Sequence, residues 1–213
     1  MTYKTRILAL TATTLLASSG LGLAQVSCNT RVTYEVEVHT HWPANDPIIP
    51  QGDGAFFTPL LALTHGPQAV MFRTGLAASL GMEVLAETGA TSVVENEAAI
   101  FGIADLLRDM AKGKNLQPQD SFTFTILAEG ELSHLSLAAG IAPSPDWFVG
   151  LDSLNLCQDG VWLEAHAEDL KTFDAGTNSA QSPGAERLET NPQGPVAYVP
   201  GSPALASVQI RLL

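Results

Sequence analysis

Acidic side chains in two turns are the part of this sequence best suited to chemistry. Asp146 lies in the run PSPDWF (residues 143–148), and Asp174 begins the run DAGTN, which ends at Asn178. Irregular backbone beside predicted strands presents carboxylate and carbonyl oxygens, which suit a hard cation such as calcium. The alternative is structural, because an Asp before a Gly commonly forms a turn by bonding its own backbone. The residues alone leave both interpretations open.

Two histidines form a weaker candidate site. His39 and His41 lie two residues apart at the end of a predicted strand, so both point to one face and could share a metal. The sequence offers no third ligand at a recognisable spacing, and it contains no Gly-rich phosphate loop, HExxH, CxxC or GxSxG motif. We therefore expect no catalytic residues, although a triad dispersed along the chain is compatible with the composition.

Residues 1–24 have the pattern of a secretory signal peptide. Two basic residues precede the apolar stretch 7–16, and Gly22 and Ala24 occupy the small-residue positions of a cleavage site. The stretch is short and rich in Thr, Ser and Gly for a permanent anchor. We expect one exported domain over residues 25–213, secreted, periplasmic or at the cell surface, with no membrane span after cleavage.

The charge balance is strongly acidic. The chain has 22 acidic and 10 basic side chains, a formal charge of −12, and removing the two basic residues of the leader lowers it to −14. Binding to nucleic acid or to an anionic membrane requires clustered Lys and Arg, so both classes of partner are excluded. The classes of partner that remain compatible with this acidic charge are cations and basic molecules.

The expected export of the chain bears on the state of its two cysteines, Cys28 and Cys157. An isolated pair usually bonds in an oxidising compartment, and the alternative is two unrelated buried thiols. A bridge would close a loop of more than 100 residues, which contributes roughly 4 kcal/mol in the chain-entropy model.

The hydrophobic pattern predicts a mostly β fold. Strict alternation of apolar and polar residues predicts strands at 32–38, 121–127 and 207–212. Shorter strands are expected at 69–72, 135–139, 148–156 and 161–166. Short strands separated by Gly, Pro, Asn and Asp favour a single antiparallel sandwich.

Two segments depart from the β pattern. Residues 77–87 and 98–112 are rich in Ala, Leu, Met and Glu, and we expect them to form helical insertions. In the second segment, apolar residues recur at helical spacing and Gly113 supplies a stop signal. Residues 173–206 lack apolar periodicity and are expected to form a long loop.

The turn motifs carry a family resemblance. The string PSPDWFVGLDSLNLC (residues 143–157), the following Trp162 and the string FDAGTNSA (173–180) resemble the spondin N-terminal domain. This module occurs in the animal matrix proteins F-spondin and mindin and in exported bacterial proteins. The strings YEVEVHTHW (34–42) and FFTPLLALTH (56–65) are similar to the bacterial members.

The resemblance implies an all-β fold with short helical insertions, an antiparallel eight-stranded β-sandwich similar to C2 domains, with calcium in the loops at one end. Position by position, it implies metal ligands at Asp146, Asp174 and Glu129, with Glu131 as the alternative third ligand. Asn178 stands where the family has an Asp, which weakens the site if that position takes part, because calcium affinity depends on ligand charge.

The resemblance also implies that Cys28 pairs with Cys157. Its functional implication is a non-enzymatic, exported calcium-binding module for recognition or adhesion, with a protein or glycan ligand at the metal-loop end. One alternative is a metal-dependent hydrolase in which the acidic cluster and its metal activate a water. Another is a structural envelope protein in which the metal only stabilises the fold.

Overall fold

The chain folds around one large antiparallel sheet with two short helices. The computed structural model describes residues 26–43, 54–180, 188, 190 and 192–213, so the expected leader lies outside the described residues. The elements in chain order are β1 (Val32–Thr40), β2 (Phe56–Phe57), β3 (Leu61–His65), α1 (Leu80–Thr88), α2 (Ser92–Ile103), β4 (Leu107–Lys112), β5 (Ser121–Ala128), β6 (His134–Ala142), β7 (Trp147–Asn155), β8 (Cys157–Gln158), β9 (Val161–Trp162), β10 (Ala165–Asp174), β11 (Ala197–Tyr198) and β12 (Ala206–Leu212).

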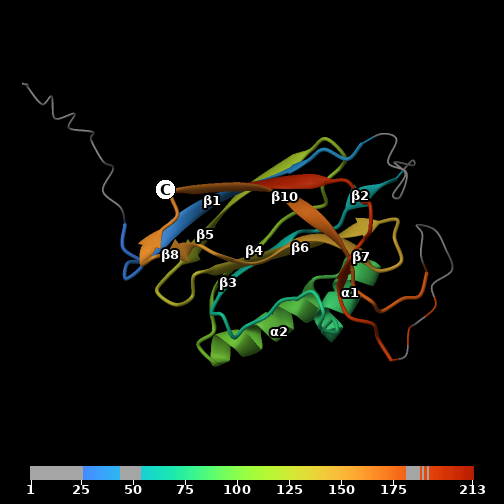
Figure 1. Cartoon of the computed structure of the whole chain (residues 1–213), viewed down its shortest axis with the longest axis horizontal. Coiled ribbons are helices and arrows are strands. Elements are labelled where there is room, and N and C mark those ends of the chain that lie inside the picture. The colour runs from blue at the N-terminus through green and yellow to red at the C-terminus, as the bar shows by residue number, and fades with distance from the viewer. Residues whose placement is uncertain (1–25, 44–53, 181–187, 189, 191) are drawn as a thin grey trace, which may run out of the picture.

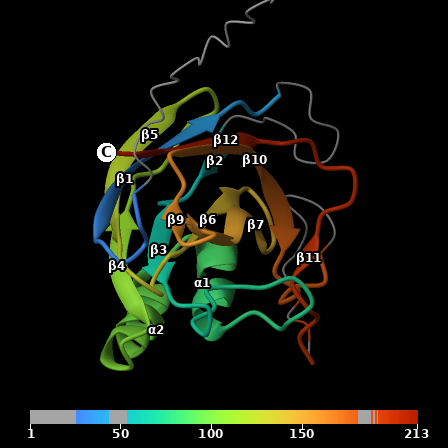
Figure 2. The ribbon, with the colours of Figure 1, turned by 60° about the vertical axis from the view of Figure 1, so that its left-hand side comes forward.

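Eight strands form the main path of the sheet, which confirms the expected antiparallel architecture. Their order is β4-β3-β6-β7-β10-β12-β1-β5, while β2 pairs with β6, β11 pairs with β10, and β8 and β9 form a separate hairpin. The sheet folds back on itself into two layers (Figures 1 and 2). The two ends of the path approach each other, because the backbone N–H of Leu127 on β5 donates to the Asp109 carboxylate on β4 at 2.8 Å. The sheet is therefore nearly closed.

Strand β10 connects the two layers. Its first residues, 165–170, pair with β12, and its last residues, 171–174, pair with β7. The main core lies between the layers, where alternate residues of β1 (Tyr34, Val36, Val38) join inward-facing residues of β6 and β7. The alternation that predicted β1 therefore reports one buried face and one exposed face.

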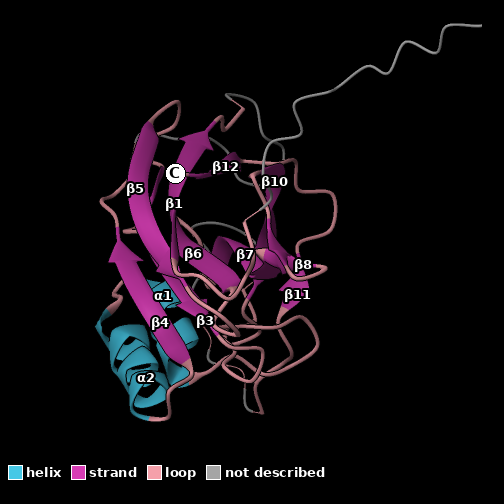
Figure 3. Cartoon of the chain, turned by 90° about the vertical axis from the view of Figure 1, so that its left-hand side faces the viewer, coloured by secondary structure: helices cyan, strands magenta, loops and turns pink. Residues whose placement is uncertain are grey.

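The helices cover the outer face of the layer that contains β3, β6 and β7. Figure 3 shows both helices on one side of the sheet. A second core fills this interface, and its members include Leu63 of β3, Phe148 of β7 and Leu85 of α1. Helix α1 begins after Ser79, whose Oγ accepts from the Met82 N–H at 3.2 Å, and ends at Gly89 in the left-handed conformation. Among the described residues, no helix is long and apolar enough to cross a bilayer.

The helix expected at 98–112 is wrong in its second half. Helix α2 ends at Ile103, Asp105 reverses the chain with φ +56°, and residues 107–112 form β4, paired with β3. The apolar residues at helical spacing do not share a buried helix face, since Ile103 is 86% exposed. Pairing with a neighbouring strand overrides the local preference of Leu, Arg, Met, Ala and Lys for helix.

The other expectations agree with the structure to different degrees. The strands expected at 32–38, 121–127, 135–139, 148–156 and 207–212 correspond to β1, β5, β6, β7 and β12, and the helix expected at 77–87 corresponds to α1. The strand expected at 69–72 is absent, although Met71 and Phe72 are buried in the second core. Segment 161–166 divides between β9 and β10, and the long loop includes β11 and the end of β10.

Candidate functional site

Asp146 lies in the turn between β6 and β7, and its side chain is completely buried. Ser144 shapes this turn, because its Oγ donates to a β6 carbonyl at 2.6 Å and accepts from the Trp147 N–H at 3.1 Å. Asp146 Oδ2 accepts from the backbone N–H groups of Thr177 and Asn178, both at 2.8 Å. Within the described part of the chain, the buried Oδ1 has no hydrogen-bond partner.

A buried carboxylate oxygen without a partner is costly. Native proteins pair nearly all buried polar atoms, because an unpaired one loses its hydration without replacement. A proton or a cation bound to Asp146 Oδ1 would therefore offset the cost of burying this atom.

Asp174 lies at the end of β10 and faces the same turn. Its Oδ1 accepts from the Gly176 N–H at 2.7 Å, and its Oδ2 accepts from the Trp147 indole N–H at 3.3 Å. Gly176 has φ +73°, a conformation that strongly favours glycine. The turn-forming interpretation of Asp174 is therefore correct for one oxygen. The backbone N–H of Ala175 also donates to the Asp146 carbonyl at 3.1 Å, which joins the two turns.

The electrostatics of this pair disfavour two free negative charges. Burial, and then the negative charge of Asp174, raise the pKa of Asp146 to about 6, against the lowering effect of the hydrogen bonds from Asn178 and Thr177. None of the ion pairs among the described residues involves either aspartate. Among the described residues, no basic side chain pairs with either carboxylate, and a bound cation would supply positive charge there.

Comparison with known proteins decides the family. The profile Spondin_N matches residues 32–204. The chain belongs to the spondin N-terminal family. It is 34% identical to Spondin-2 of Homo sapiens over 152 residues, covering 70% of this chain and 45% of that protein. It is 33% identical to Spondin-2 of Rattus norvegicus over 152 residues, covering 70% and 46%. It is also 29% identical to Spondin-1 of Gallus gallus, covering 63% and 18%. The chain thus spans less than half the length of these relatives.

In this spondin domain, the side chain of Asn178 holds the loop that follows the second turn. Its Oδ1 accepts from the backbone N–H of Ala180 at 3.0 Å and of Leu188 at 3.1 Å. Only its backbone N–H reaches Asp146. The amide oxygen that could have replaced a carboxylate ligand is therefore already bonded to the backbone.

The structure does not bring Glu129 to the two aspartates. Glu129 Oε2 lies 2.9 Å from the Arg31 guanidinium and 2.8 Å from Arg108 Nε. The hydrogen bond from Arg31 is the main reason that the pKa of Glu129 is lowered. Glu129 precedes β6 and Asp146 follows it, so a nine-residue strand, about 30 Å long at 3.4 Å per residue, separates them. Glu131 lies in the same distant turn and is exposed.

Glu87, at the end of α1, is the acidic residue that the sequence reasoning missed. The Thr177 hydroxyl lies 2.8 Å from Glu87 Oε1 and 3.2 Å from Asp146 Oδ2, so it lies between the two carboxylates, and its single proton is best placed for the nearer oxygen of Glu87. The only signal for Glu87 in the sequence is indirect, because Glu87 is the last residue of the helix expected at 77–87. Its approach to residue 177 depends on how α1 packs on β6 and β7.

Metal-ligand side chains are sparse around the site. In the part of the chain that the structure describes, no three His, Cys, Asp or Glu side chains form a group that could hold a metal ion. A cation here would therefore rely on two carboxylates and on further oxygens from water or a partner.

The histidine pair, the weaker candidate site, lies elsewhere. His39 Nε2 lies 3.2 Å from Glu37 Oε2 on the same strand, so this histidine already has a carboxylate partner.

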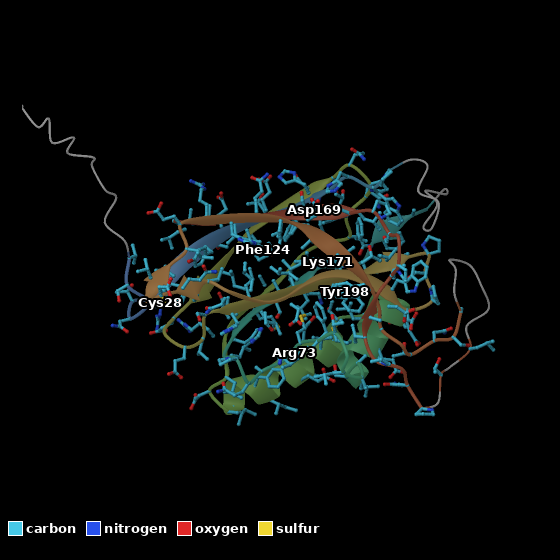
Figure 4. The ribbon with its side chains drawn as sticks, in the orientation of Figure 1. Cys28, Arg73, Phe124, Asp169, Lys171 and Tyr198 are labelled. Atoms are coloured by element: carbon cyan, nitrogen blue, oxygen red, sulfur yellow. A yellow bond between two sulfur atoms is a disulfide. The ribbon has the colours of Figure 1, made fainter. Side chains whose placement is uncertain are left out.

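The two cysteines are joined in the structure, as the resemblance implies. Cys28 and Cys157 have Cα atoms 5.9 Å apart and are 129 residues apart in sequence. Figure 4 shows Cys28 at one end of the molecule. The Trp162 indole N–H donates to the Thr30 carbonyl at 3.0 Å, so the start of the domain is fixed at two points near β8 and β9.

Proposed function

We propose that this chain is an exported, non-enzymatic recognition or adhesion module whose Asp146–Asp174 pair binds calcium. Family membership supports the adhesion role. Calcium binding is supported by the buried Oδ1 of Asp146, which has no hydrogen-bond partner among the described residues and lies near a second carboxylate, that of Asp174. Carboxylates and irregular backbone are the donor set that calcium prefers.

The small number of protein ligands favours recognition at this site. Calcium takes six to eight oxygen ligands, and the two aspartates supply only part of such a shell. The remaining positions would be filled by water or by an oxygen from a partner protein or glycan. Calcium would then both neutralise the carboxylates and attract an acidic or hydroxylated group of the partner.

The proposal is tested by thermal unfolding of the purified protein in EDTA and in calcium. A ligand that binds only the folded state stabilises it, by about 2.7 kcal/mol at one hundred times the dissociation constant. We expect calcium to raise the Tm of the wild type and to leave the Tm of Asp146→Asn unchanged. The matched control is Asp159→Asn, at an exposed turn with φ +52° that Asn also tolerates.

The control should respond to calcium as the wild type does. A wild-type Tm that is the same in EDTA and in calcium would exclude the cation. Binding of a partner to the wild type that is lost in EDTA and in Asp146→Asn would support the recognition role.

A further inference from the structure

A cleft of about 370 Å³ lies directly beside the aspartate pair. It is bounded by the end of α1, the residues around β2 and the turn between β6 and β7. Figure 1 shows α1, β2 and β7 together at the end of the molecule opposite β8. The residues that matter here are Phe56, Pro59, Glu87, Thr88, Asn115 and Pro143.

The walls of the cleft are mostly apolar and stiff. Phe56 and Pro59 are half-buried on one side, and Pro143 is exposed on the other. Ile141 and Pro145 are buried in the lining. Such walls accept a slender apolar stem or a flat group, because the Phe ring presents a flat apolar face and the Pro rings are apolar and already rigid.

The charge of the cleft is negative. Among the described residues that line it, Glu87 is the one ionisable side chain. The carboxyl end of α1 forms part of the rim, and its last turn contains no basic residue. Unpaired carbonyls make a helix carboxyl end the negative pole of its dipole. The buried Asp146 lies behind this rim, linked to Glu87 through the Thr177 hydroxyl. An anionic occupant would be repelled by Glu87 and by the carboxyl end of α1.

We propose that this cleft binds the side chain of an arginine from a protein partner. Within the described part of the chain, Glu87 uses Oε1 to accept from Thr177, and Oε2 makes no hydrogen bond. A guanidinium is planar and weakly hydrated, so it can lie on the Phe56 ring while it donates to Oε2. Its methylene stem would contact Pro59 and Pro143. The excess of acidic residues in the chain, 22 against 10 basic, fits a basic partner.

This inference rests on the proposed recognition function but does not require calcium, and the experiment separates the two. The probe is the peptide Gly-Arg-Gly, acetylated and amidated, and its control replaces arginine with citrulline, which has the same shape without the charge. Both are titrated in EDTA into the isotope-labelled protein, and amide shifts of residues 86–89 are followed by NMR. We expect the arginine peptide to bind at least about tenfold more tightly, which corresponds to about 1.4 kcal/mol.

Two matched variants locate the contact. Glu87→Gln keeps an acceptor for Thr177, so we expect an unchanged fold and about tenfold weaker binding of the arginine peptide. Glu83→Gln lies on the same helix, where Glu83 Oε2 accepts from Gln193 at 2.7 Å, and should bind the peptide as the wild type does. Equal binding of the two peptides, or a Glu87→Gln protein that keeps full affinity, would overturn the proposal. If calcium does not bind but the arginine peptide does, the cation claim fails and the arginine site stands.

Discussion

Replacing Asp146 with Asn removes a titrating group whose effect on stability can be calculated. In the metal-free protein, burial and the charge of Asp174 raise the pKa of Asp146 from 3.8 to about 6. A carboxyl group with a higher pKa in the folded than in the unfolded state stabilises the fold while it is protonated. That contribution is complete below the unfolded pKa and is lost as the pH rises through the folded pKa. At 1.36 kcal/mol for each pKa unit, the loss is about 3 kcal/mol.

The assay is urea unfolding of the wild type and of Asp146→Asn in EDTA, from about pH 4 to about pH 8. Titrating groups that do not interact with Asp146 contribute equally to both proteins, so the difference in unfolding free energy reports Asp146 together with its coupling to Asp174. The Asn side chain still accepts from the Thr177 and Asn178 N–H groups, and any cost of its amide N–H group is independent of pH. Between about pH 4 and about pH 8 we expect the wild type to lose about 2.4 kcal/mol relative to the variant, which is most of the full effect, because the lower limit lies just above the unfolded pKa of 3.8. A difference that does not change with pH would mean that burial does not raise the pKa of Asp146.

Other perturbations test the scaffold around the site. Cys28→Ser with Cys157→Ser should lower the unfolding free energy by about 4 to 5 kcal/mol, measured by denaturant unfolding, because the bridge joins residues 129 apart. Gly160→Ala, at φ +78° with open space around it, should cost about 1 kcal/mol in the same assay. Gly160→Ala is the control for Gly176→Ala, which adds a Cβ atom 2.6 Å from a backbone carbonyl oxygen. Gly176→Ala should therefore lower the unfolding free energy by more than Gly160→Ala does, and it should also abolish calcium binding. Burial lowers the pKa of His65 below 6.5, so the contribution of His65 to stability should fall as the pH decreases below 6.5. The difference in unfolding free energy between the wild type and His65→Gln should therefore shrink over this pH range.

The fold was predictable where one face of a strand is buried. In β1, β5 and β12 the apolar and polar residues alternate strictly, so the sequence pattern reports burial directly. The prediction of one helix over 98–112 was wrong for two reasons. Ile100 and Ile103 are apolar but exposed, so their spacing does not mark a buried helix face. Residues 107–112 form a strand because they pair with β3. Strand pairing is a long-range property that local spacing does not encode.

The site was predictable for the two aspartates and not for their neighbours. Asp146 and Asp174 lie in turn motifs whose local sequence fixes their conformation, through Ser144 in one turn and Gly176 in the other. The role of Asn178 depends on contacts with residues 180 and 188. Glu87 comes close only because α1 packs on the sheet, and local sequence contains no information on that packing.

Calorimetric titration of calcium into the purified protein shows whether the aspartate pair binds a cation. We expect one calcium ion bound for each chain of the wild type and of Asp159→Asn, and no binding to Asp146→Asn. We also expect weaker binding at pH values below about 6, because protonation of Asp146 competes with the ion. No heat of binding with the wild type, or equal binding by Asp146→Asn, would show that Asp146 does not hold calcium.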